Sequence, residues 1–222
     1  GVGSSGASAV AAAVAVNELL GRPASLEQVC AAAMEGEQAG CGAIHPDNVA
    51  PSLYGGFVLA RSVHPPDIVR LPVPAGLACA VLHPHQEVQT GASRALLGDS
   101  VPLATAVRQW ANLGALVSAL HSGDLDLLSR SLVDHVAEPK RQVLVPGFAD
   151  VKAAALAAGA LGCSLSGSGP SIFALTRSLD AAHVVGGAMR EAFAAASGVA
   201  ADLWVSLVGR TGARIVDLAE VR

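Results

Sequence analysis

The most constraining feature of the sequence is an almost wholly apolar segment, residues 8–20, that directly follows a cluster of glycines and serines. Ala, Val and Leu fill this segment, and Gly21 and Pro23 supply the stop signals of a helix C-terminus. A helix that is apolar all round is buried, and this one is shorter than the roughly 18 residues that suggest a membrane span. The pattern predicts a buried helix that begins at a glycine-rich loop.

The rest of the chain predicts helices mixed with strands, in either an α/β or an α+β fold. Of its 222 residues 52% are hydrophobic and 14% charged, enough to bury a core without disulfides or metal. Ser25 and Gln28 form a capping-box pattern that predicts a second helix running towards Gln38. Residues 40–51 are predicted to be irregular, and residues 55–63 and 67–73 to form a strand pair.

The later part of the sequence repeats a strand and helix rhythm that is typical of a split β-α-β sandwich. Its predicted strands cover residues 76–82, 163–165, 172–176, 203–208 and 214–218. Its predicted helices cover residues 102–121, 125–136, 147–158 and 179–196. We place the boundary between two domains at residues 72 and 73, which gives segments 1–72 and 73–222.

Charge and cysteine usage narrow the class of protein. The formal net charge is −4 and no long run of Lys or Arg occurs, which argues against a nucleic-acid partner. No membrane anchor or signal pattern is visible, and the cysteines lie far apart, which favours reduced thiols in a cytoplasmic protein. These cysteines are Cys30, Cys41, Cys79 and Cys163. His83 and His85 are the nearest histidine pair, but no carboxylate or thiol lies at ligand spacing from them. We therefore interpret them as ordinary loop or strand-end histidines rather than as a metal site.

The first glycine-rich loop matches the spacing G-x-G-x-x-G at Gly1, Gly3 and Gly6. No strand ending in an acidic residue follows, as a dinucleotide site requires, and no Lys follows, as a Walker A sequence requires. A loop of small residues at a helix N-terminus suits a nucleotide phosphate. The alternative is a tight turn with Ser4 or Ser5 as helix N-cap. Because such a loop needs a scaffold on both sides, we expect a missing segment upstream of Gly1.

A second loop, residues 164–171, is also rich in glycine and serine and lies between two predicted strands. It has the composition of a simple hairpin connection. Together with the first loop it offers a second set of backbone N–H groups, so the pair suits a phosphate chain enclosed from two sides.

Several blocks together resemble the conserved blocks of the GHMP kinases. The main ones are Gly-Ser-Ser-Gly-Ala-Ser at 3–8, Gly-Ala-Ile-His-Pro-Asp-Asn-Val-Ala-Pro at 42–51 and Ser-Gly-Ser-Gly-Pro at 166–170. Further matches lie at residues 90–94, 137–141, 144–148 and 212–214. The middle block is similar to that of the homoserine kinases within this family, and the resemblance spans essentially the whole chain.

The resemblance implies a ribosomal-protein-S5-like N-terminal domain, incomplete in residues 1–72, and a ferredoxin-like C-terminal domain in residues 73–222. It implies a cytoplasmic kinase of threonine biosynthesis that binds ATP, Mg²⁺ and L-homoserine in a cleft between the domains. The family's N-terminal strands, with polar residues that help to hold homoserine, are absent from this sequence. A homodimer is plausible on base rates for such enzymes.

The resemblance also assigns residues to ATP and Mg²⁺. The residues that match the family's ATP-phosphate loops are Gly1, Gly3, Ser4, Ser5, Gly6, Ala7, Ser8, Gly167, Ser168 and Gly169. Ser5 and Glu37 match the Mg²⁺ ligands, and one hydroxyl with one carboxylate is chemically suited to that ion. The alternative for Glu37 is a solvated acid near a helix end.

A further set matches the family's substrate site. Its members are His45, Asp47, Asn48, Thr90, Arg94 and Arg141. Asp47 is the candidate to accept the hydroxyl proton, and Asn48 is the candidate to orient the substrate. Arg94 and Arg141 suit the homoserine carboxylate or the transferring phosphate, because guanidinium groups pair well with oxyanions. The alternatives are loop-capping side chains for His45 and Asn48, and ordinary surface charges for the arginines.

Two rival functions remain at this point. One is a GHMP kinase that acts on mevalonate or a sugar, although the paired arginines argue against an acceptor without a carboxylate. The other is a non-catalytic module that binds a nucleotide but transfers no phosphate. Restoring the expected upstream segment and measuring turnover distinguishes an enzyme from a binding module.

Overall fold

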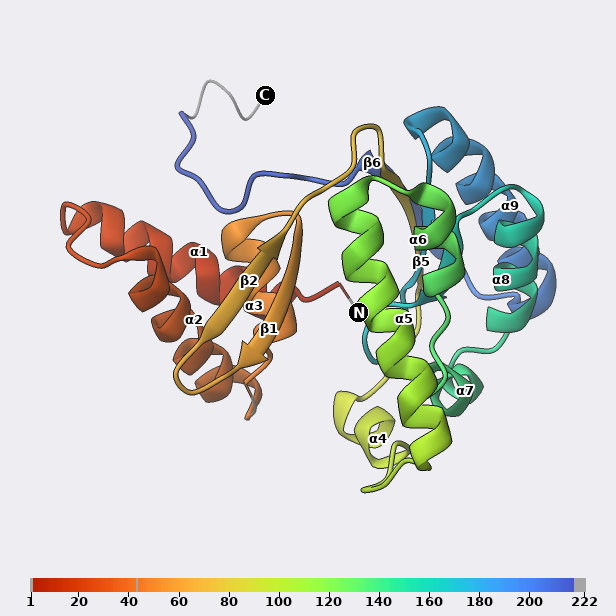
Figure 1. The fold of residues 1–222 in the computed structure, drawn as a ribbon, viewed down its shortest axis with the longest axis horizontal. Helices are drawn as coiled ribbons and strands as arrows, with labels where there is room; N and C mark the ends of the chain where they lie inside the picture. Colours follow the sequence, from red (N-terminus) through yellow and green to blue (C-terminus); the bar gives the residue numbers. More distant parts are fainter. Residues whose placement is uncertain (1, 43, 218–222) are drawn as a thin grey trace. The chain divides into compact units, whose positions relative to one another are not determined.

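The structure, a computed structural model, describes residues 2–42 and 44–217 (Figure 1). It divides into two compact units. The first unit contains Val2–Val73 together with the segment from Gly209 onwards, and the second contains Pro74–Val208.

The first unit holds a three-helix group and a small antiparallel sheet. Its elements are α1 (Ser4–Leu19), α2 (Leu26–Cys41), α3 (Pro46–Tyr54), β1 (Phe57–Ser62) and β2 (Asp67–Leu71). The predicted capping box at the start of α2 is present, with Ser25 and Gln28 exchanging side-chain and backbone hydrogen bonds. The strands β1 and β2 pair as predicted, and the structure shows that they run antiparallel. The core includes Val10 from α1, Met34 from α2 and Leu53 from α3.

The helix α3 corrects the prediction of an irregular stretch at residues 40–51. Pro46 occupies the first turn of α3, where its missing N–H costs no hydrogen bond, and Asp47 lies near the positive end of the helix dipole. Pro51 lies inside the helix, where a proline removes one backbone hydrogen bond. The buried face of Val49 and Leu53 outweighs that cost, because these side chains join the core of the unit.

The chain after Gly209 returns to the first unit as an irregular segment. Gly56 donates a backbone hydrogen bond to Gly209 at 2.8 Å, and Ala213 donates one to Ser52 at 2.9 Å. The predicted strand at residues 214–218 is wrong over its described part, 214–217, and Leu218 lies outside the described residues. Ile215 is 55% exposed, so this segment buries no face of the kind that stabilises a strand.

The second unit is built around a four-stranded antiparallel sheet in the order β4-β5-β3-β6. The strands are β3 (Ala78–Pro84), β4 (Gly162–Leu165), β5 (Ile172–Thr176) and β6 (Ala201–Leu207). The helices are α4 (Thr90–Ala95), α5 (Leu103–Ser122), α6 (Leu125–Ser131), α7 (Glu138–Arg141), α8 (Phe148–Ala157) and α9 (Leu179–Ser197). A short 3₁₀ turn covers Gln142–Leu144. This strand order and its crossing helices form the predicted ferredoxin-like arrangement.

One face of this sheet carries the main hydrophobic core. The helices α8 and α9 lie side by side there (Figure 1), and Phe148, Val185 and Phe193 pack with the inward-facing Leu82 and Ile172 of the strands. The sequence pattern predicted α5, α8 and α9 closely. It overextended α6, which ends at Ser131 rather than at residue 136.

The early end of α6 has a local cause. The Asp134 carboxylate accepts hydrogen bonds from the backbone N–H groups of Val136, Ala137 and Glu138, so it caps a new turn instead of continuing the old helix. The six-residue helix α4 was not predicted. Among the described residues, no helix is both long enough and apolar enough to cross a membrane.

Candidate functional site

The first glycine-rich loop leads directly into α1. Gly3 is the residue before the helix and has a left-handed backbone with φ of 73°, and no side chain among the described residues caps the helix there. Ser4 and Ser5 lie inside the first turn, so the alternative that one of them is the N-cap is wrong. The first backbone N–H groups of a helix have no intrahelical partners and attract anions. This geometry favours a phosphate ligand. Gly1 lies outside the described residues.

The same loop lies against the start of α3. A Cβ placed on Gly3 would approach Asn48 Oδ1 to 2.8 Å, and one on Gly6 would approach Asn48 Cβ to 3.1 Å. Glycine is therefore required at Gly3 both by its backbone conformation and by this close contact. The structure thus brings the predicted substrate residue Asn48 next to the predicted phosphate loop.

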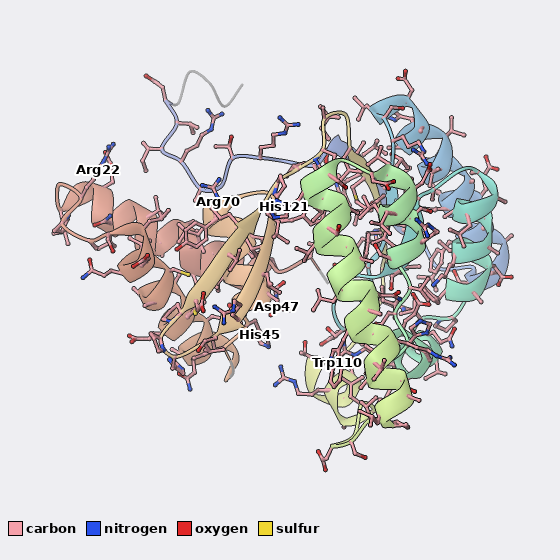
Figure 2. The ribbon with its side chains drawn as sticks, viewed as in Figure 1. Arg22, His45, Asp47, Arg70, Trp110 and His121 are labelled. Carbon is pink, nitrogen blue, oxygen red and sulfur yellow. The ribbon has the colours of Figure 1, made fainter. Side chains whose placement is uncertain are left out.

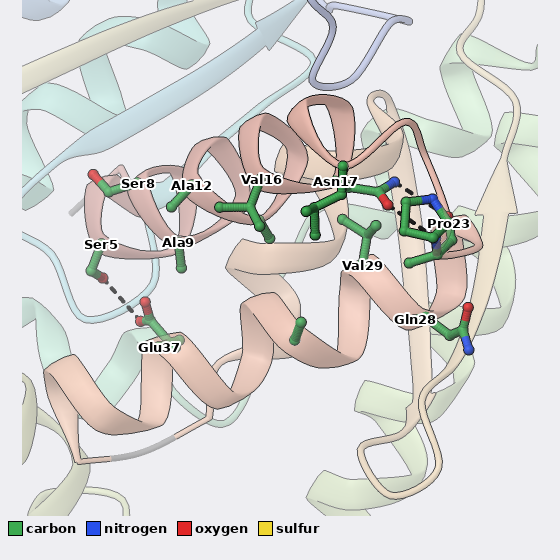
Figure 3. A pocket seen from close by; sticks show the side chains of 15 residues that line it. Ser5, Ser8, Ala9, Ala12, Val16, Asn17, Pro23, Gln28, Val29 and Glu37 are labelled. Carbon is green, nitrogen blue, oxygen red and sulfur yellow. Dashed lines mark hydrogen bonds between the residues drawn. The ribbon is translucent and has the colours of Figure 1, made fainter.

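Glu37 lies in α2 and is only 2% exposed. Ser5 Oγ donates a hydrogen bond to Glu37 Oε1 at 2.9 Å, as Figure 3 shows, and His45 Nδ1 lies 2.9 Å from the same oxygen. The second oxygen, Oε2, is buried and has no hydrogen-bond partner among the described residues. The alternative that Glu37 is a solvated acid is therefore wrong. A buried carboxylate oxygen without a partner is costly, and a bound cation or hydrogen-bond donor would remove that cost.

The donors around Glu37 fit a magnesium ion. Mg²⁺ prefers oxygen ligands and keeps several waters, so one hydroxyl and one carboxylate are a sufficient protein contribution. Within residues 2–42 and 44–217, no group of three or more His, Cys, Asp or Glu side chains is arranged to hold a metal. Such a group is expected for zinc, whereas Mg²⁺ bound together with phosphates does not require it.

His45 and Asp47 lie at the start of α3 (Figure 2). His45 precedes the helix, and its side chain does not cap α3. Its Nδ1 instead contacts Glu37, the predicted metal ligand. Asp47 is exposed in the first turn of α3. Both predicted substrate residues therefore belong to the same corner of the first unit as Ser5 and Glu37.

The helix α1 is less buried than its apolar sequence predicted. Leu19 is 86% exposed and Val16 is 55% exposed, because α2 and α3 cover only one side of α1. A groove of about 780 Å³ runs between α1 and α2, from Ser5 and Glu37 at one end to Asn17 and Pro23 at the other (Figure 3). Small apolar side chains of α1 and α2 line most of it.

The remaining predicted residues of the first loop have ordinary helical positions. The Ser8 hydroxyl donates to the backbone carbonyl of Ser4 at 2.9 Å, one turn earlier. Ala7 is exposed and donates its backbone N–H to Gly3 at 3.0 Å. Among the hydrogen bonds of the described residues, only that of Ser5, and not one from Ala7 or Ser8, links this loop's side chains to Glu37.

The second glycine-rich loop joins β4 to β5, so it is indeed a hairpin connection. Gly167 and Gly169 both have positive φ, at 58° and 81°. The backbone of Ser166 donates to Ser171 at 2.8 Å, and Gly169 donates to Ser166 at 3.0 Å. The loop is therefore a tight, internally bonded turn.

Side chains from two other segments hold this second loop by its carbonyl oxygens. Arg141 Nη1 donates to Gly167 at 3.0 Å, and Ser93 Oγ donates to Ser168 at 3.3 Å. Arg141 Nε also reaches the carbonyl of Ser93 at 3.5 Å. The structure thus joins the predicted residues Arg141, Gly167 and Ser168. Thr90 and Arg94 lie on the exposed side of α4, which carries the fully buried Ser93.

Sequence reasoning missed three polar residues that support the second loop. Ser93 is one, and its place between Thr90 and Arg94 in a family block was the available signal. The others are Ser171 and His83, whose Oγ and Nδ1 lie 2.8 Å apart. His85 contacts Asp202 instead, so the two nearby histidines have different partners.

Comparison with known proteins gives consistent matches. Residues 1–56 match the GHMP kinases N terminal domain, and residues 116–195 match the GHMP kinases C terminal domain. The chain is 52% identical to a homoserine kinase of Chlorobium phaeovibrioides over 217 residues, 97% of this chain and 68% of that protein. It is 44% identical to a homoserine kinase of Pyrococcus furiosus over 210 residues, 95% of this chain and 70% of that protein.

Solved structures agree with these matches. A crystal structure of homoserine kinase from Cytophaga hutchinsonii superposes with a TM-score of 0.88 and 53% identity, covering 91% of this chain and 64% of that one. A mevalonate kinase of L. major has a TM-score of 0.71 but only 19% identity, so its likeness concerns the fold alone. The chain therefore spans about two thirds of the length of the proteins that it resembles.

Proposed function

Because the chain belongs to the GHMP kinase family, we propose that it transfers the γ-phosphate of ATP to the side-chain hydroxyl of L-homoserine. The observation that carries this proposal is the 52% identity to a homoserine kinase over 97% of the chain. The products are O-phospho-L-homoserine and ADP, which is a step towards threonine.

The first unit supplies groups for the phosphates and the metal. The backbone N–H groups at the start of α1 bind phosphate oxygens, because they have no partners within the helix. Ser5 and Glu37 would hold Mg²⁺, and the buried, unpartnered Oε2 of Glu37 supports this assignment. When bound, Mg²⁺ neutralises part of the charge on the phosphates. The contact from His45 to Oε1 fixes the orientation of the Glu37 carboxylate.

Homoserine carries a carboxylate that needs a cationic partner. Arg94 and Arg141 are the candidates, and the hydrogen bonds of Arg141 to Gly167 and Ser93 hold its guanidinium in a defined orientation. Thr90 contributes a hydroxyl on the same short helix as Arg94. This pairing favours an amino-acid acceptor over a sugar or another uncharged alcohol.

The transfer itself is an in-line displacement, in which positioning and electrostatic stabilisation supply most of the acceleration. Asn48 orients the acceptor from its position beside the first loop. Asp47 is exposed in the first turn of α3 and is the candidate that accepts the hydroxyl proton. Gly167 and Ser168 offer further backbone N–H groups for the nucleotide phosphates, whereas the N–H of Gly169 is bonded to Ser166 within the loop.

The test is ADP release from ATP and Mg²⁺ with L-homoserine as acceptor, with mevalonate and galactose as comparison acceptors. We expect turnover with homoserine but not with mevalonate or galactose. The phosphorylated homoserine should give a new phosphomonoester signal by ³¹P NMR. The chain is assayed by itself and joined to an upstream segment taken from a homoserine kinase relative. ATP binding without homoserine-dependent ADP release in both forms would replace the kinase by a non-catalytic nucleotide-binding module.

A further inference from the structure

An ionic network in the second unit has no part in the chemistry described above. Glu138 is the first residue of α7, and its side chain is only 12% exposed. One carboxylate oxygen pairs with Lys152 Nζ from α8, and the other accepts a hydrogen bond from Ser164 Oγ of β4 at 2.6 Å. The backbone N–H of Glu138 donates to Asp134 at 3.0 Å. Three separate elements therefore meet at one carboxylate.

The elements that Glu138 joins also carry the second glycine-rich loop and its guanidinium partner. Arg141 lies three residues after Glu138, one turn along α7, and donates to the carbonyl of Gly167. Ser164 lies in β4, the strand that leads into the loop containing Gly167. The contacts form a closed ring: from Glu138 to Ser164, along the strand to Gly167, across to Arg141 and back along α7.

The short length of α7 makes this anchor necessary. A helix of four residues has almost no intrinsic stability, so contacts with the rest of the unit must hold it. An apolar side chain in place of Glu138 would avoid the cost of burying charge, and such replacements are often neutral for stability. A carboxylate instead fixes direction, because it bonds a cation and a hydroxyl at defined angles. The network thus suits orientation of α7 better than simple packing.

We propose that Glu138 is a positioning residue that sets the Arg141 guanidinium against the second glycine-rich loop. It acts through Lys152 and Ser164 and does not touch the substrate. The role in catalysis rests on the proposed homoserine kinase function. The anchoring itself is a property of the second unit and is measured separately.

The kinetic test compares the wild-type chain with Glu138→Gln, Arg141→Lys and the double variant. Glu138→Gln keeps the size of the side chain but removes the charge that pairs with Lys152. We expect it to raise KM for homoserine about tenfold, with a smaller change in kcat. In the Arg141→Lys background, Glu138→Gln is expected to raise KM for homoserine by less than about twofold, because the guanidinium that Glu138 positions is already gone. If Glu138 had a purely structural role, independent of Arg141, the double variant would show the product of the two single rises in KM.

Three further variants extend this test. Ser164→Ala removes only the hydroxyl contact, and we expect about a threefold rise in KM, which Ser164→Thr reverses by restoring a hydroxyl. Asp126→Asn breaks the exposed ion pair with Arg177 in the same unit, away from Glu138, and is expected to leave KM unchanged. These variants also keep the proposal testable if Glu138→Gln fails to fold.

Hydrogen exchange at residues 141–144 and 166–171 tests the anchor without any activity. We expect faster exchange there in Glu138→Gln and Ser164→Ala but not in Asp126→Asn. Absence of homoserine turnover in the wild type would remove the proposed function, while the exchange rates would still decide the anchoring role. Unchanged KM and unchanged exchange in both Glu138→Gln and Ser164→Ala would overturn the proposal, as would fully multiplicative effects of Glu138→Gln and Arg141→Lys.

Discussion

The two glycine-rich loops have similar compositions but are held in place in different ways. The first is fixed by its own left-handed backbone at Gly3, before α1, and by the close packing of Asn48 against its glycines. The second is held by side-chain hydrogen bonds, because Arg141 and Ser93 donate to its carbonyl oxygens. A glycine motif therefore indicates a tight backbone but not what holds it.

The two loops also differ in the charge beside them. The first lies in the same unit as Glu37, a buried carboxylate with one unpartnered oxygen, and Ser5 of that loop contacts it directly. The second is contacted by the cationic Arg141. We propose that a metal ion binds beside the phosphates at the first loop, and that an anion binds beside the second. The following predictions test this contrast, from the largest expected effect to the smallest.

The largest effect is expected at Glu37. Glu37→Gln keeps the acceptor for Ser5 but removes the negative charge that would hold Mg²⁺, so kcat is expected to fall about a thousandfold. The measurement is homoserine-dependent ADP release across a Mg²⁺ titration. Glu35→Gln is the matched control, because Glu35 lies in the same helix but is exposed. Retention of more than about a tenth of the activity in Glu37→Gln would contradict the metal assignment.

At the second loop the corresponding change is Arg141→Lys. Lys keeps the charge but cannot reproduce the guanidinium geometry that reaches both Gly167 and Ser93, so we expect KM for homoserine to rise about thirtyfold. Steady-state kinetics at saturating MgATP measure this rise. Arg108→Lys, at an exposed position of α5, should leave KM unchanged. A similar KM in both variants would mean that Arg141 only supports the loop.

A smaller contrast is expected when each loop receives one methyl group. Gly3→Ala places an alanine in a left-handed conformation that alanine disfavours, and its methyl group displaces Asn48. The Kd for ATP is therefore expected to rise about tenfold. Gly167→Ala carries only the cost of its left-handed backbone, about 1 kcal/mol, because the space around Gly167 is open. Its effect on the Kd for ATP is therefore expected to be smaller than that of Gly3→Ala. Isothermal titration measures both, with Gly114→Ala in the open middle of α5 as control. Equal effects of Gly3→Ala and Gly167→Ala would remove the difference between the loops.

Local signals in the sequence predicted most of the fold. The Ser25 and Gln28 capping box predicted α2, and the rhythm of the later segments predicted the ferredoxin-like sheet. Failures occurred where distant contacts outweigh local preference. Pro51 lies within α3 because Val49 and Leu53 gain burial, and residues 214–217 form no strand because they bury no face.

The candidate site residues came from family blocks rather than from physical pattern alone. Nothing local to Glu37 reveals that its side chain is buried, since that depends on how α1, α2 and α3 pack. The bond from Arg141 to Gly167 spans 26 residues of sequence, and the bond from Ser93 to Ser168 spans 75. Spacing rules extend over a few residues, so such pairs are visible only in the folded chain.

The last prediction concerns the stability of the unit that holds the second loop. Burial raises the pKa of Cys79 to about 11 and that of Cys163, in β4, to about 12. Both thiols stay protonated in the folded state when the unfolded chain begins to ionise near pH 9. The free energy of unfolding is therefore unaffected by these thiols at pH 7, and it falls as pH rises from about 9 towards the folded pKa values.

At pH 10 the expected loss is about 1 kcal/mol for each thiol. Both tryptophans, Trp110 and Trp204, lie in the second unit, so their fluorescence during urea unfolding at pH 7 and pH 10 reports its stability. The variant with Cys79→Ala and Cys163→Ala should lose correspondingly less stability between these pH values. An equal pH dependence in both proteins would mean that the two thiols ionise as readily in the folded unit as in the unfolded chain. In that case β4, which carries Cys163 and leads into the second loop, would be far more accessible to solvent than the buried Glu37 beside the first loop.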